Sequence, residues 1–362
     1  MRIGVPKEIK TLEDRVGLIP EVVKGLVRRG HEVAIETLAG QGIGASDADY
    51  VAAGATVLPD ADAVFAFAEM IVKVKEPQAV EVARLKPHHI LFTYLHLAAD
   101  VPQTRGLQAS GCTAIAYETI VGRDGRLPLL TPMSQVAGRM AVDVGVLLML
   151  KPWGGPGVLL SGVPGVAPGK VVILGGGVSG TEAARIAVGQ GADVTIFDID
   201  PHRLAELDAR FDGRVKTVFS THDAILAAAR DADLIVGCVL IPGASAPKLI
   251  SRADLAQLKP GVVLVDVAID QGGCFETSRP TTHADPTYRV DGVLHYCVAN
   301  MPGAAARTST YALNAATQPY VIALADKGVA QAFADDPGFA LGLNVQAGKI
   351  THPAVEAAVA GQ

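Results

Sequence analysis

The sequence predicts an α/β fold with two doubly wound parallel sheets, each covered by helices on both faces. The first observation is residues 170–198, where a short apolar strand, a glycine turn, a helix and a second strand follow without a gap. The second is that strand-like and helix-like segments alternate before and after this stretch, as they do in parallel sheets. The third is the length of 362 residues, which exceeds one average domain.

Residues 170–198 have the pattern of a dinucleotide-binding unit. Gly175, Gly177 and Gly180 occupy the first, third and sixth positions of the turn. The first glycine permits a tight turn, the second lets the backbone approach a pyrophosphate, and the third lets helix and strand pack closely. Asp198 closes the second strand, where a carboxylate can accept hydrogen bonds from an adenosine ribose. A tight turn without a ligand is the alternative interpretation.

The first part of the chain predicts another α/β domain, without a glycine fingerprint and therefore with a different ligand. Gly30 ends its first helix, and Ser46 is a typical N-cap for a short helix. Strands are expected at residues 2–6, 31–36, 70–74, 90–93 and 113–116, and helices at residues 21–29, 46–53 and 100–109.

Residues 131–150 predict one long helix, and the Gly- and Pro-rich residues 152–169 predict a connecting loop. Beyond the glycine stretch the alternation resumes. Strands are expected at 215–219, 234–239 and 262–267, helices at 223–230, 252–258 and 310–325, a polar crossover at 300–310, and short helices from 330 onward.

Composition excludes several classes of protein. The chain is 49% hydrophobic, and its formal net charge of −6 without a long basic run argues against a nucleic-acid surface. Its four cysteines are far apart with no CxxC pair, which favours a reducing cytoplasm over a disulfide framework. The N-terminus lacks a signal-peptide apolar region, and the apolar run 144–150 is too short to span a bilayer. We therefore expect a cytoplasmic protein with no membrane and no nucleic-acid partner.

Four polar residues follow predicted strands, where ligands of open α/β sheets bind. Arg15 and Lys75 can hold a carboxylate, Arg through a bidentate fork and Lys as a point charge. His96 has an ordinary pKa suited to proton transfer, and Asp270 completes an acid–base pair. Individually, the two cations could be solvated loop charges, His96 a buried core histidine and Asp270 a cap. No clustered His/Cys spacing indicates a metal, so none is expected.

Longer motifs extend this pattern. They are residues 4–8 with 15–16, 73–77, 93–97, 132–139, 162–166, 171–180, 266–273 and 300–303 with 307–310. On these motifs the chain resembles the L-alanine dehydrogenase family, the group that also includes the NAD-binding subunit of proton-translocating transhydrogenase. It departs from the family at Thr11-Leu12, at Gly17 and at Lys327, where some members carry a histidine near a bound magnesium.

The resemblance implies a fold, an activity and a set of site residues. It implies a substrate domain at 1–130 and 306–362, with a Rossmann-like NAD domain at 131–305 inserted into it, in a homo-oligomer that is a hexamer. It implies reversible oxidative deamination of L-alanine by NAD to pyruvate and ammonium, with Arg15 and Lys75 binding the substrate carboxylate and His96 and Asp270 as catalytic residues. The implied NAD contacts are Ser134, Gly175, Gly177, Val178, Ser179, Gly180, Asp198, Arg203, Ser220, Val239, Leu240, Val267, Ala268, Ile269, Asp270, Arg279, Val298, Ala299, Asn300 and Met301.

Three alternatives stay open. The first is the transhydrogenase α subunit, which is disfavoured because the chain carries no membrane-spanning segments and keeps all four substrate residues. The second is a catalytically silent NAD-binding regulator, which would lack one of those four. The third is a related amine dehydrogenase with a larger substrate.

Overall fold

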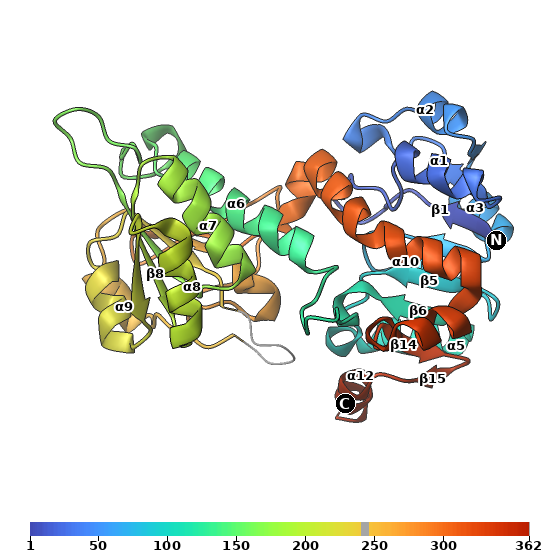
Figure 1. Cartoon of the computed structure of the whole chain (residues 1–362). Coiled ribbons are helices and arrows are strands. Elements are labelled where there is room, and N and C mark those ends of the chain that lie inside the picture. Colours follow the sequence, from blue (N-terminus) through green and yellow to red (C-terminus); the bar gives the residue numbers. More distant parts are fainter. Residues whose placement is uncertain (240–245, 362) are drawn as a thin grey trace. The chain divides into compact units, whose positions relative to one another are not determined.

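The computed structural model describes residues 1–239 and 246–361, which form two compact units (Figure 1). Unit 1 comprises Met1–Met133 and Gly303–Gln362, and unit 2 comprises Ser134–Pro302, so unit 2 is inserted into unit 1 along the sequence. Each unit contains a mainly parallel sheet with helices packed against it. The predicted α/β class with two doubly wound sheets is confirmed. The assignment of substrate to one unit and NAD to the other remains a prediction.

The sheet of unit 1 has eight strands in the order β15-β14-β6-β5-β4-β1-β2-β3. Strands β1 to β6 pair in parallel, whereas β14 pairs antiparallel with β6 and with β15. The sequence did not predict β3, β14 or β15, because polar residues in β14 (LNVQ) and β15 (KI) interrupt the apolar run and β3 (TVL) has only three residues. The bounds are β1 Arg2–Val5, β2 Glu32–Glu36, β3 Thr56–Leu58, β4 Met70–Val72, β5 Ile90–Thr93, β6 Thr113–Ala116, β14 Leu343–Gln346 and β15 Lys349–Ile350.

Helices α1, α2 and α5 begin and end within one residue of the predicted ranges, whereas α3 and α4 were not predicted. Ser46 caps α2 by accepting a hydrogen bond from the Asp49 N–H, and the Asp49 carboxylate accepts the Ser46 N–H in return. Helix α10 is longer than expected and is kinked at Gly328, which adopts φ 73° and ψ 169°. The α-helices are α1 Pro20–Arg28, α2 Asp47–Ala52, α3 Ala61–Phe67, α4 Ala79–Val82, α5 Val101–Ser110, α10 Ala306–Asp335, α11 Pro337–Ala340 and α12 Pro353–Ala360, and the 3₁₀ turns are η1 Gln41–Ile43, η2 Leu97–Ala99 and η3 Tyr117–Thr119.

The sheet of unit 2 has seven strands in the order β12-β13-β11-β10-β7-β8-β9, of which only the β12–β13 pair is antiparallel among the described strands. The segment 252–258, expected as a helix, contains a 3₁₀ turn instead. The strands are β7 Lys170–Leu174, β8 Asp193–Asp198, β9 Val215–Phe219, β10 Leu234–Gly237, β11 Val263–Asp266, β12 Thr287–Val290 and β13 Val293–Tyr296. The helical segments are α6 Thr131–Leu148, η4 Lys151–Trp153, α7 Val178–Gly189, α8 Pro201–Phe211, α9 His222–Ala229, η5 Ala253–Gln257, η6 Val267–Gln271 and η7 Met301–Ala305.

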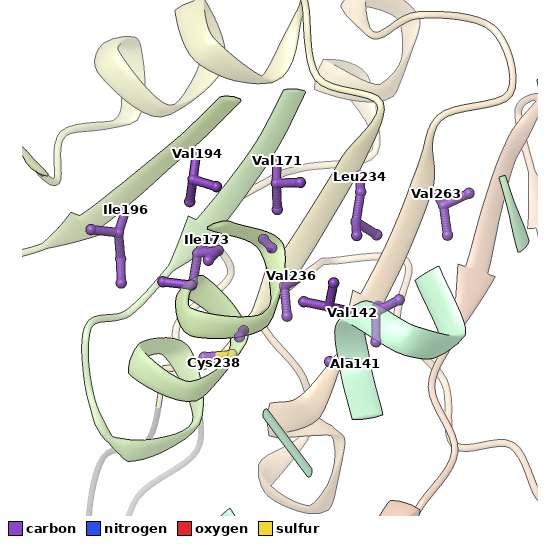
Figure 2. Close-up of a cluster of buried hydrophobic side chains, with 14 of the residues drawn as sticks. Ala141, Val142, Val171, Ile173, Val194, Ile196, Leu234, Val236, Cys238 and Val263 are labelled. Carbon is purple, nitrogen blue, oxygen red and sulfur yellow. The ribbon is translucent and has the colours of Figure 1, made fainter. Parts of the chain in front are cut away.

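The strands of unit 2 contribute side chains to two hydrophobic cores, one on each face of the sheet. On β7, Val171 and Ile173 join the core that includes Ala141 and Val142 of α6 (Figure 2), whereas Val172 and Leu174 join the opposite core. Successive strand residues point to opposite faces, so an apolar run on a central strand fills both cores. Figure 1 shows α7 and α8 lying over β8 in this unit.

Both sheets have the same central order, β3-β2-β1-β4-β5-β6 in unit 1 and β9-β8-β7-β10-β11-β13 in unit 2. In each sheet the order in which successive strands are added reverses beside the first strand, between β1 and β4 in unit 1 and between β7 and β10 in unit 2. A crevice forms at the carboxyl ends of the strands at such a point, and ligands of open α/β sheets bind there. Over the described residues, every helix is too short or too polar to cross a membrane.

Candidate functional site

The glycine turn of unit 2 lies at the carboxyl end of β7, at the reversal point of the sheet. Gly175 adopts φ +98°, a conformation that glycine reaches without steric cost. A Cβ on Gly180 would lie 1.9 Å from the Gly175 carbonyl oxygen, so only glycine permits this close approach. Gly177 is the N-cap of α7 and no side chain caps the helix, so the first N–H groups of α7 can meet an anion.

Asp198 and Arg203 are both hydrogen-bonded to this turn. The Asp198 carboxylate accepts the Gly176 N–H at 2.7 Å and the Asp200 N–H at 2.9 Å, one on each oxygen. Each oxygen keeps a second lone pair for another donor. Arg203 donates to the Gly176 carbonyl oxygen at 2.6 Å and to the Thr181 hydroxyl at 2.6 Å. The arginine is therefore anchored to the turn.

Most other predicted NAD residues follow strands of unit 2. Ser179 donates its hydroxyl hydrogen to the Ser134 carbonyl oxygen at 3.0 Å, which ties the start of α7 to α6. Ser220 follows β9, Val239 follows β10, and residues 298–301 follow β13. Arg279 instead stacks on the ring of Tyr288 at 4.0 Å. The residues predicted here are Ser134, Val178, Ser179, Ser220, Val239, Arg279, Val298, Ala299, Asn300 and Met301; Leu240 lies outside the described residues.

Asp270 lies on η6, the 3₁₀ turn that follows β11 and also contains Val267, Ala268 and Ile269, and its side chain is exposed. The turn is held by the fully buried Asp266, which sequence reasoning missed. Asp266 accepts the Ala268 N–H at 3.1 Å, the Cys274 N–H at 2.8 Å and the Ser278 hydroxyl hydrogen at 2.5 Å. Burial raises the pKa of Asp266 above its ordinary value.

In unit 1, Arg15 follows β1 and is buried in a bidentate ion pair with Glu13. Its Nε and a terminal nitrogen donate to the two Glu13 oxygens, both at 2.6 Å, and its other terminal nitrogen lies 3.1 Å from the sulfur of Met133. Burial opposes the arginine charge, but the hydrogen bonds and ion pair with Glu13 outweigh it and raise the pKa of Arg15. Glu13 thus fixes the plane of the guanidinium.

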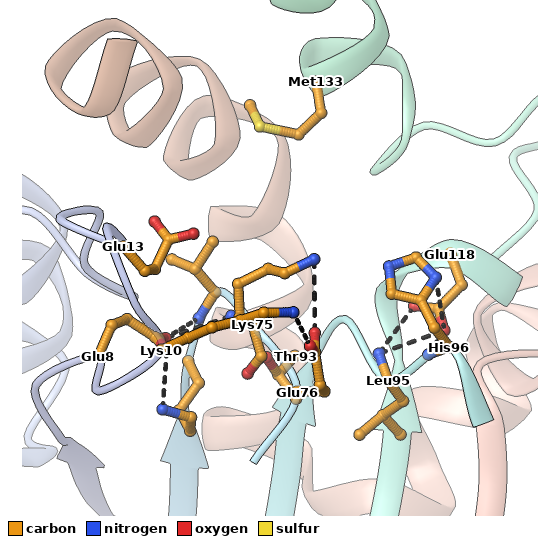
Figure 3. Close-up of polar contacts among 12 residues, drawn as sticks. Glu8, Lys10, Glu13, Lys75, Glu76, Thr93, Leu95, His96, Glu118 and Met133 are labelled. Atoms are coloured by element: carbon orange, nitrogen blue, oxygen red, sulfur yellow. Dashed lines mark hydrogen bonds and ion pairs between the residues drawn. The ribbon is translucent and has the colours of Figure 1, made fainter. Parts of the chain in front are cut away.

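Lys75 lies three residues past the end of β4. Its ammonium lies 3.4 Å from one carboxylate oxygen of Glu76, and Lys10 donates to the other oxygen (Figure 3). The Lys75 side chain is 13% exposed, so its amine retains limited contact with solvent.

His96 follows β5 and adopts a left-handed backbone conformation, φ 52° and ψ 37°. The Glu118 carboxylate accepts the His96 N–H at 2.6 Å and the Leu95 N–H at 3.2 Å, and lies 4.0 Å from His96 Nδ1 (Figure 3). The imidazole stacks on Tyr94, with ring centroids 5.9 Å apart and planes 8° apart. The His96 side chain is 47% exposed, so it is not the buried core histidine of the alternative interpretation.

Arg15, Lys75 and His96 therefore follow three neighbouring strands of one sheet, β1, β4 and β5. Asp270 and the predicted NAD residues belong to unit 2. The sequence did not identify Glu13 as the partner of Arg15 or Glu118 as the partner of His96. The only signal for Glu13 is its position two residues before Arg15 in a charged loop. Over the residues that the structure describes, no group of three or more His, Cys, Asp or Glu side chains could hold a metal.

Comparison with family models gives two matches that together span most of the chain. The model described as "Alanine dehydrogenase/PNT, N-terminal domain" matches residues 4–137, and the model described as "Alanine dehydrogenase/PNT, C-terminal domain" matches residues 141–353.

Similar proteins cover the chain almost completely. The alanine dehydrogenase of Halomonas elongata is 62% identical over 355 residues, 98% of this chain and 96% of that protein. The alanine dehydrogenase of Mycobacterium tuberculosis is 53% identical over 350 residues, 97% of this chain and 94% of that protein.

Among solved structures, an L-alanine dehydrogenase at 53% identity has a TM-score of 0.97 and covers 100% of this chain and 99% of its own. A transhydrogenase from Sinorhizobium meliloti has a TM-score of 0.85 at 23% identity over 97% of this chain and 100% of its own, a likeness of fold alone.

Proposed function

The chain belongs to the alanine dehydrogenase/PNT family, and on that premise we propose that it catalyses the reversible reaction of L-alanine, NAD⁺ and water to pyruvate, ammonium, NADH and a proton. The observation that carries the proposal is that Arg15, Lys75 and His96 follow three neighbouring strands of one sheet. Two cations suit a substrate carboxylate, and a partly exposed histidine suits proton transfer.

The glycine turn fits a dinucleotide. Gly180 has no room for a Cβ, whereas nothing lies within 4 Å of a Cβ placed on Gly177, which leaves space for a ligand beside the uncapped start of α7. In this proposal Asp198, whose two oxygens each accept one backbone N–H, also accepts the adenosine ribose hydroxyls. When bound, NAD supplies the hydride acceptor at its nicotinamide ring.

Residues of the chain bind the substrate and move protons. Arg15 and Lys75 orient the alanine carboxylate, and this orientation makes hydride loss from Cα effectively unimolecular. The resulting substrate iminium is positively charged, and Asp270 stabilises that charge. The alanine amine loses a proton before hydride loss, which gives the iminium. Water then adds to the iminium carbon and passes one proton to His96, which returns it to the amine nitrogen. The C–N bond breaks as the carbonyl of pyruvate forms, and the remaining hydroxyl proton leaves with the ammonia as ammonium.

The proposal includes a cytoplasmic homohexamer. Its support is the family membership and the absence of a membrane-spanning helix over the described residues. Size-exclusion chromatography with light scattering measures the mass in solution, and a monomer would contradict this part of the proposal.

An assay of NADH absorbance with a panel of amino acids, and of pyruvate with ammonium in reverse, tests the activity. We expect L-alanine to give the highest kcat/KM. A larger amino acid in first place would favour a related amine dehydrogenase. Hydride exchange between nicotinamide nucleotides without amino acid turnover would favour the transhydrogenase subunit, and cofactor binding without any turnover would favour a silent regulator.

A further inference from the structure

Two motifs of unit 1 contain charges that the proposed chemistry does not use. Residues 4–8 end in Glu8, and residues 73–77 begin with Lys73. Lys73 is fully buried, and Glu8 is 5% exposed. A buried ammonium or carboxylate loses several kcal/mol of hydration free energy unless a partner replaces the water, so these residues need an explanation.

Lys73 is the centre of a buried triad with two glutamates. Its ammonium lies 2.9 Å from Glu8 Oε2 and 2.8 Å from Glu81 Oε1 on α4. Burial alone would lower the pKa of Lys73, but the two carboxylates outweigh it and raise that pKa, so the lysine stays charged. A buried ion pair is weak evidence for a stabilising role, because well-packed apolar residues often replace one without loss.

The second oxygen of Glu8 has a different task. Glu8 Oε1 accepts the Val74 N–H at 2.7 Å and the Lys75 N–H at 3.2 Å (Figure 3). Strand β4 ends at Val72, and its ladder with β1 ends at Ile71, so the β1 strand offers these two N–H groups no carbonyl partner. The Glu8 carboxylate accepts the hydrogen bonds that a carbonyl group of a neighbouring strand would otherwise accept.

The carbonyl groups of the same segment are held from the β5 side. The Thr93 hydroxyl donates to the Lys75 carbonyl oxygen at 2.9 Å, and the Tyr94 N–H donates to the Val74 carbonyl oxygen at 3.3 Å. The main chain of Lys75 is therefore fixed by a side chain on each side, Glu8 on one and Thr93 on the other.

We propose that Glu8 is a positioning residue for Lys75: Lys73 holds one oxygen of the Glu8 carboxylate, and the other oxygen fixes the main chain from which the Lys75 ammonium reaches the substrate carboxylate. This inference rests on the proposed function, in which Lys75 binds that carboxylate. The inference accounts for the buried charges of Glu8 and Lys73. A neutral residue in place of Glu8 would be a poorer acceptor for the Val74 and Lys75 N–H groups, or would leave Lys73 without this partner.

A purely stabilising role for the triad is the competing explanation, and Glu81 provides the matched control. Glu81 pairs with the same Lys73 ammonium, and its other oxygen accepts the Gln78 N–H at 2.8 Å at the start of α4. Glu81→Gln removes one charge from the triad while Glu8 keeps its bonds to Val74 and Lys75.

The experiment compares Glu8→Ala, Glu8→Gln and Glu81→Gln with the parent in pyruvate reduction, and measures apparent thermal midpoints alongside. We expect Glu8→Ala to raise the KM for pyruvate about tenfold or more with a fall in kcat, since a misplacement of 1 Å can cost about 10²-fold. The KM for NADH should stay within about twofold, because the glycine turn belongs to unit 2. Glu8→Gln should be intermediate, because one amide oxygen cannot serve both Lys73 and the two N–H groups.

Glu81→Gln should lower the thermal midpoint by an amount comparable to Glu8→Gln and leave the KM for pyruvate within about twofold of the parent. An equal rise of this KM in Glu81→Gln and Glu8→Gln, or an unchanged KM in the Glu8 variants, overturns the inference. If Glu8→Ala does not fold, the Glu8→Gln and Glu81→Gln pair decides alone. An inactive parent would contradict the proposed function, whereas an active parent with equal variants contradicts only the role of Glu8.

Discussion

The two units have the same central strand order but differ in the residues that follow their strands. In unit 2 the end of β7 is a turn of glycines, with Gly175 at φ +98° and no side-chain cap on α7. In unit 1 the segments that follow β1, β4 and β5 contain Arg15, Lys75 and His96, each within 4.0 Å of a protein carboxylate. One unit presents backbone N–H groups, and the other presents charged side chains.

The difference is clearest at Gly175 and His96, which both adopt a positive φ. Gly175 adopts its positive φ at no steric cost, whereas the same region costs a side chain about 1–2 kcal/mol. His96 adopts φ 52°, and the Glu118 carboxylate accepts its N–H and that of Leu95. At Gly175 the backbone reaches its conformation because a side chain is absent, whereas at His96 the conformation coincides with hydrogen bonds to a neighbouring carboxylate.

The largest expected effect tests the side-chain site. His96→Ala should lower kcat about 10²–10⁴-fold, the usual contribution of general acid–base catalysis, while the affinity for NADH persists. Steady-state kinetics and NADH fluorescence titration measure the two effects. His88→Ala is the control, because His88 is an exposed histidine of the same unit. A near-normal kcat in His96→Ala would remove His96 from the reaction.

Asp198 tests the choice of cofactor by the backbone site. An NADP 2′-phosphate beside its carboxylate would meet a repulsion of about 4 kcal/mol, for charges about 4 Å apart at an effective dielectric of about 20. We expect strict NAD preference in the parent and a loss of more than about 10²-fold of that preference in Asp198→Ala. Arg203 is held by the turn and can then meet the phosphate.

A second variant separates the Asp198 charge from its contact with the turn. Asp198→Asn removes the charge but keeps an oxygen that can accept the Gly176 N–H, which Asp198 accepts at 2.7 Å. If charge excludes NADP, both variants lose the preference, and only Asp198→Ala disturbs the turn and lowers NAD affinity further. If the ratio of kcat/KM for NAD to kcat/KM for NADP is the same in the parent, Asp198→Ala and Asp198→Asn, the adenosine ribose does not bind at Asp198.

The glycine turn itself gives the next effect. Gly180→Ala places a Cβ 1.9 Å from the Gly175 oxygen, and overpacking of this kind typically costs about 1–3 kcal/mol of stability. Gly177→Ala meets nothing within 4 Å, so the thermal midpoint should stay unchanged while NADH affinity falls. Melting curves and NADH titration of both variants distinguish fold from ligand contact. Unchanged NADH affinity in Gly177→Ala would mean that the pyrophosphate does not approach this residue.

The sequence predicted the backbone site more completely than the side-chain site. Glycine positions encode backbone geometry directly, so the strand, turn, helix and terminal Asp198 could be placed from residues 170–198 alone. Arg15, Lys75 and His96 were placed at strand ends by their position after apolar runs. Their supports could not be predicted, because pairs such as Glu8 with Lys73 are 65 residues apart and leave no local pattern.

The missed elements have a similar cause. Strands β14 (LNVQ) and β15 (KI) pair antiparallel at the edge of the unit 1 sheet, and their polar residues interrupt the apolar run that marks strands such as β4 (MIV) and β5 (ILFT). The segment 252–258 has helical composition, but only five residues form a 3₁₀ turn. Tertiary pairing decides such segments, whereas strands with a continuous apolar run, such as β7, follow from composition.

The smallest effect concerns an ion pair of unit 1 away from the strand ends. Asp326 on α10 accepts from Arg29 at 2.7 Å and contacts His31 Nε2 at 2.8 Å. The hydrogen bond from His31 and the nearby Arg29 hold the pKa of Asp326 below its ordinary value. A carboxylate with a lowered folded pKa stabilises the fold above its unfolded pKa of about 3.9, and this stabilisation disappears as the pH falls through the folded pKa.

We therefore expect Asp326→Asn to lower the free energy of unfolding by less than about 1 kcal/mol at pH 7, as for most exposed pairs, with no change in kcat/KM. The difference in thermal midpoint from the parent should narrow as the pH falls from 5 toward 3. Asp62→Asn is the control, since that carboxylate is 76% exposed beside Arg84 and should change nothing measurable. A loss of activity in Asp326→Asn would mean that charged residues far from the ends of β1, β4 and β5 also affect the reaction. The two units would then differ in the role of charge throughout each unit and not only at the strand ends.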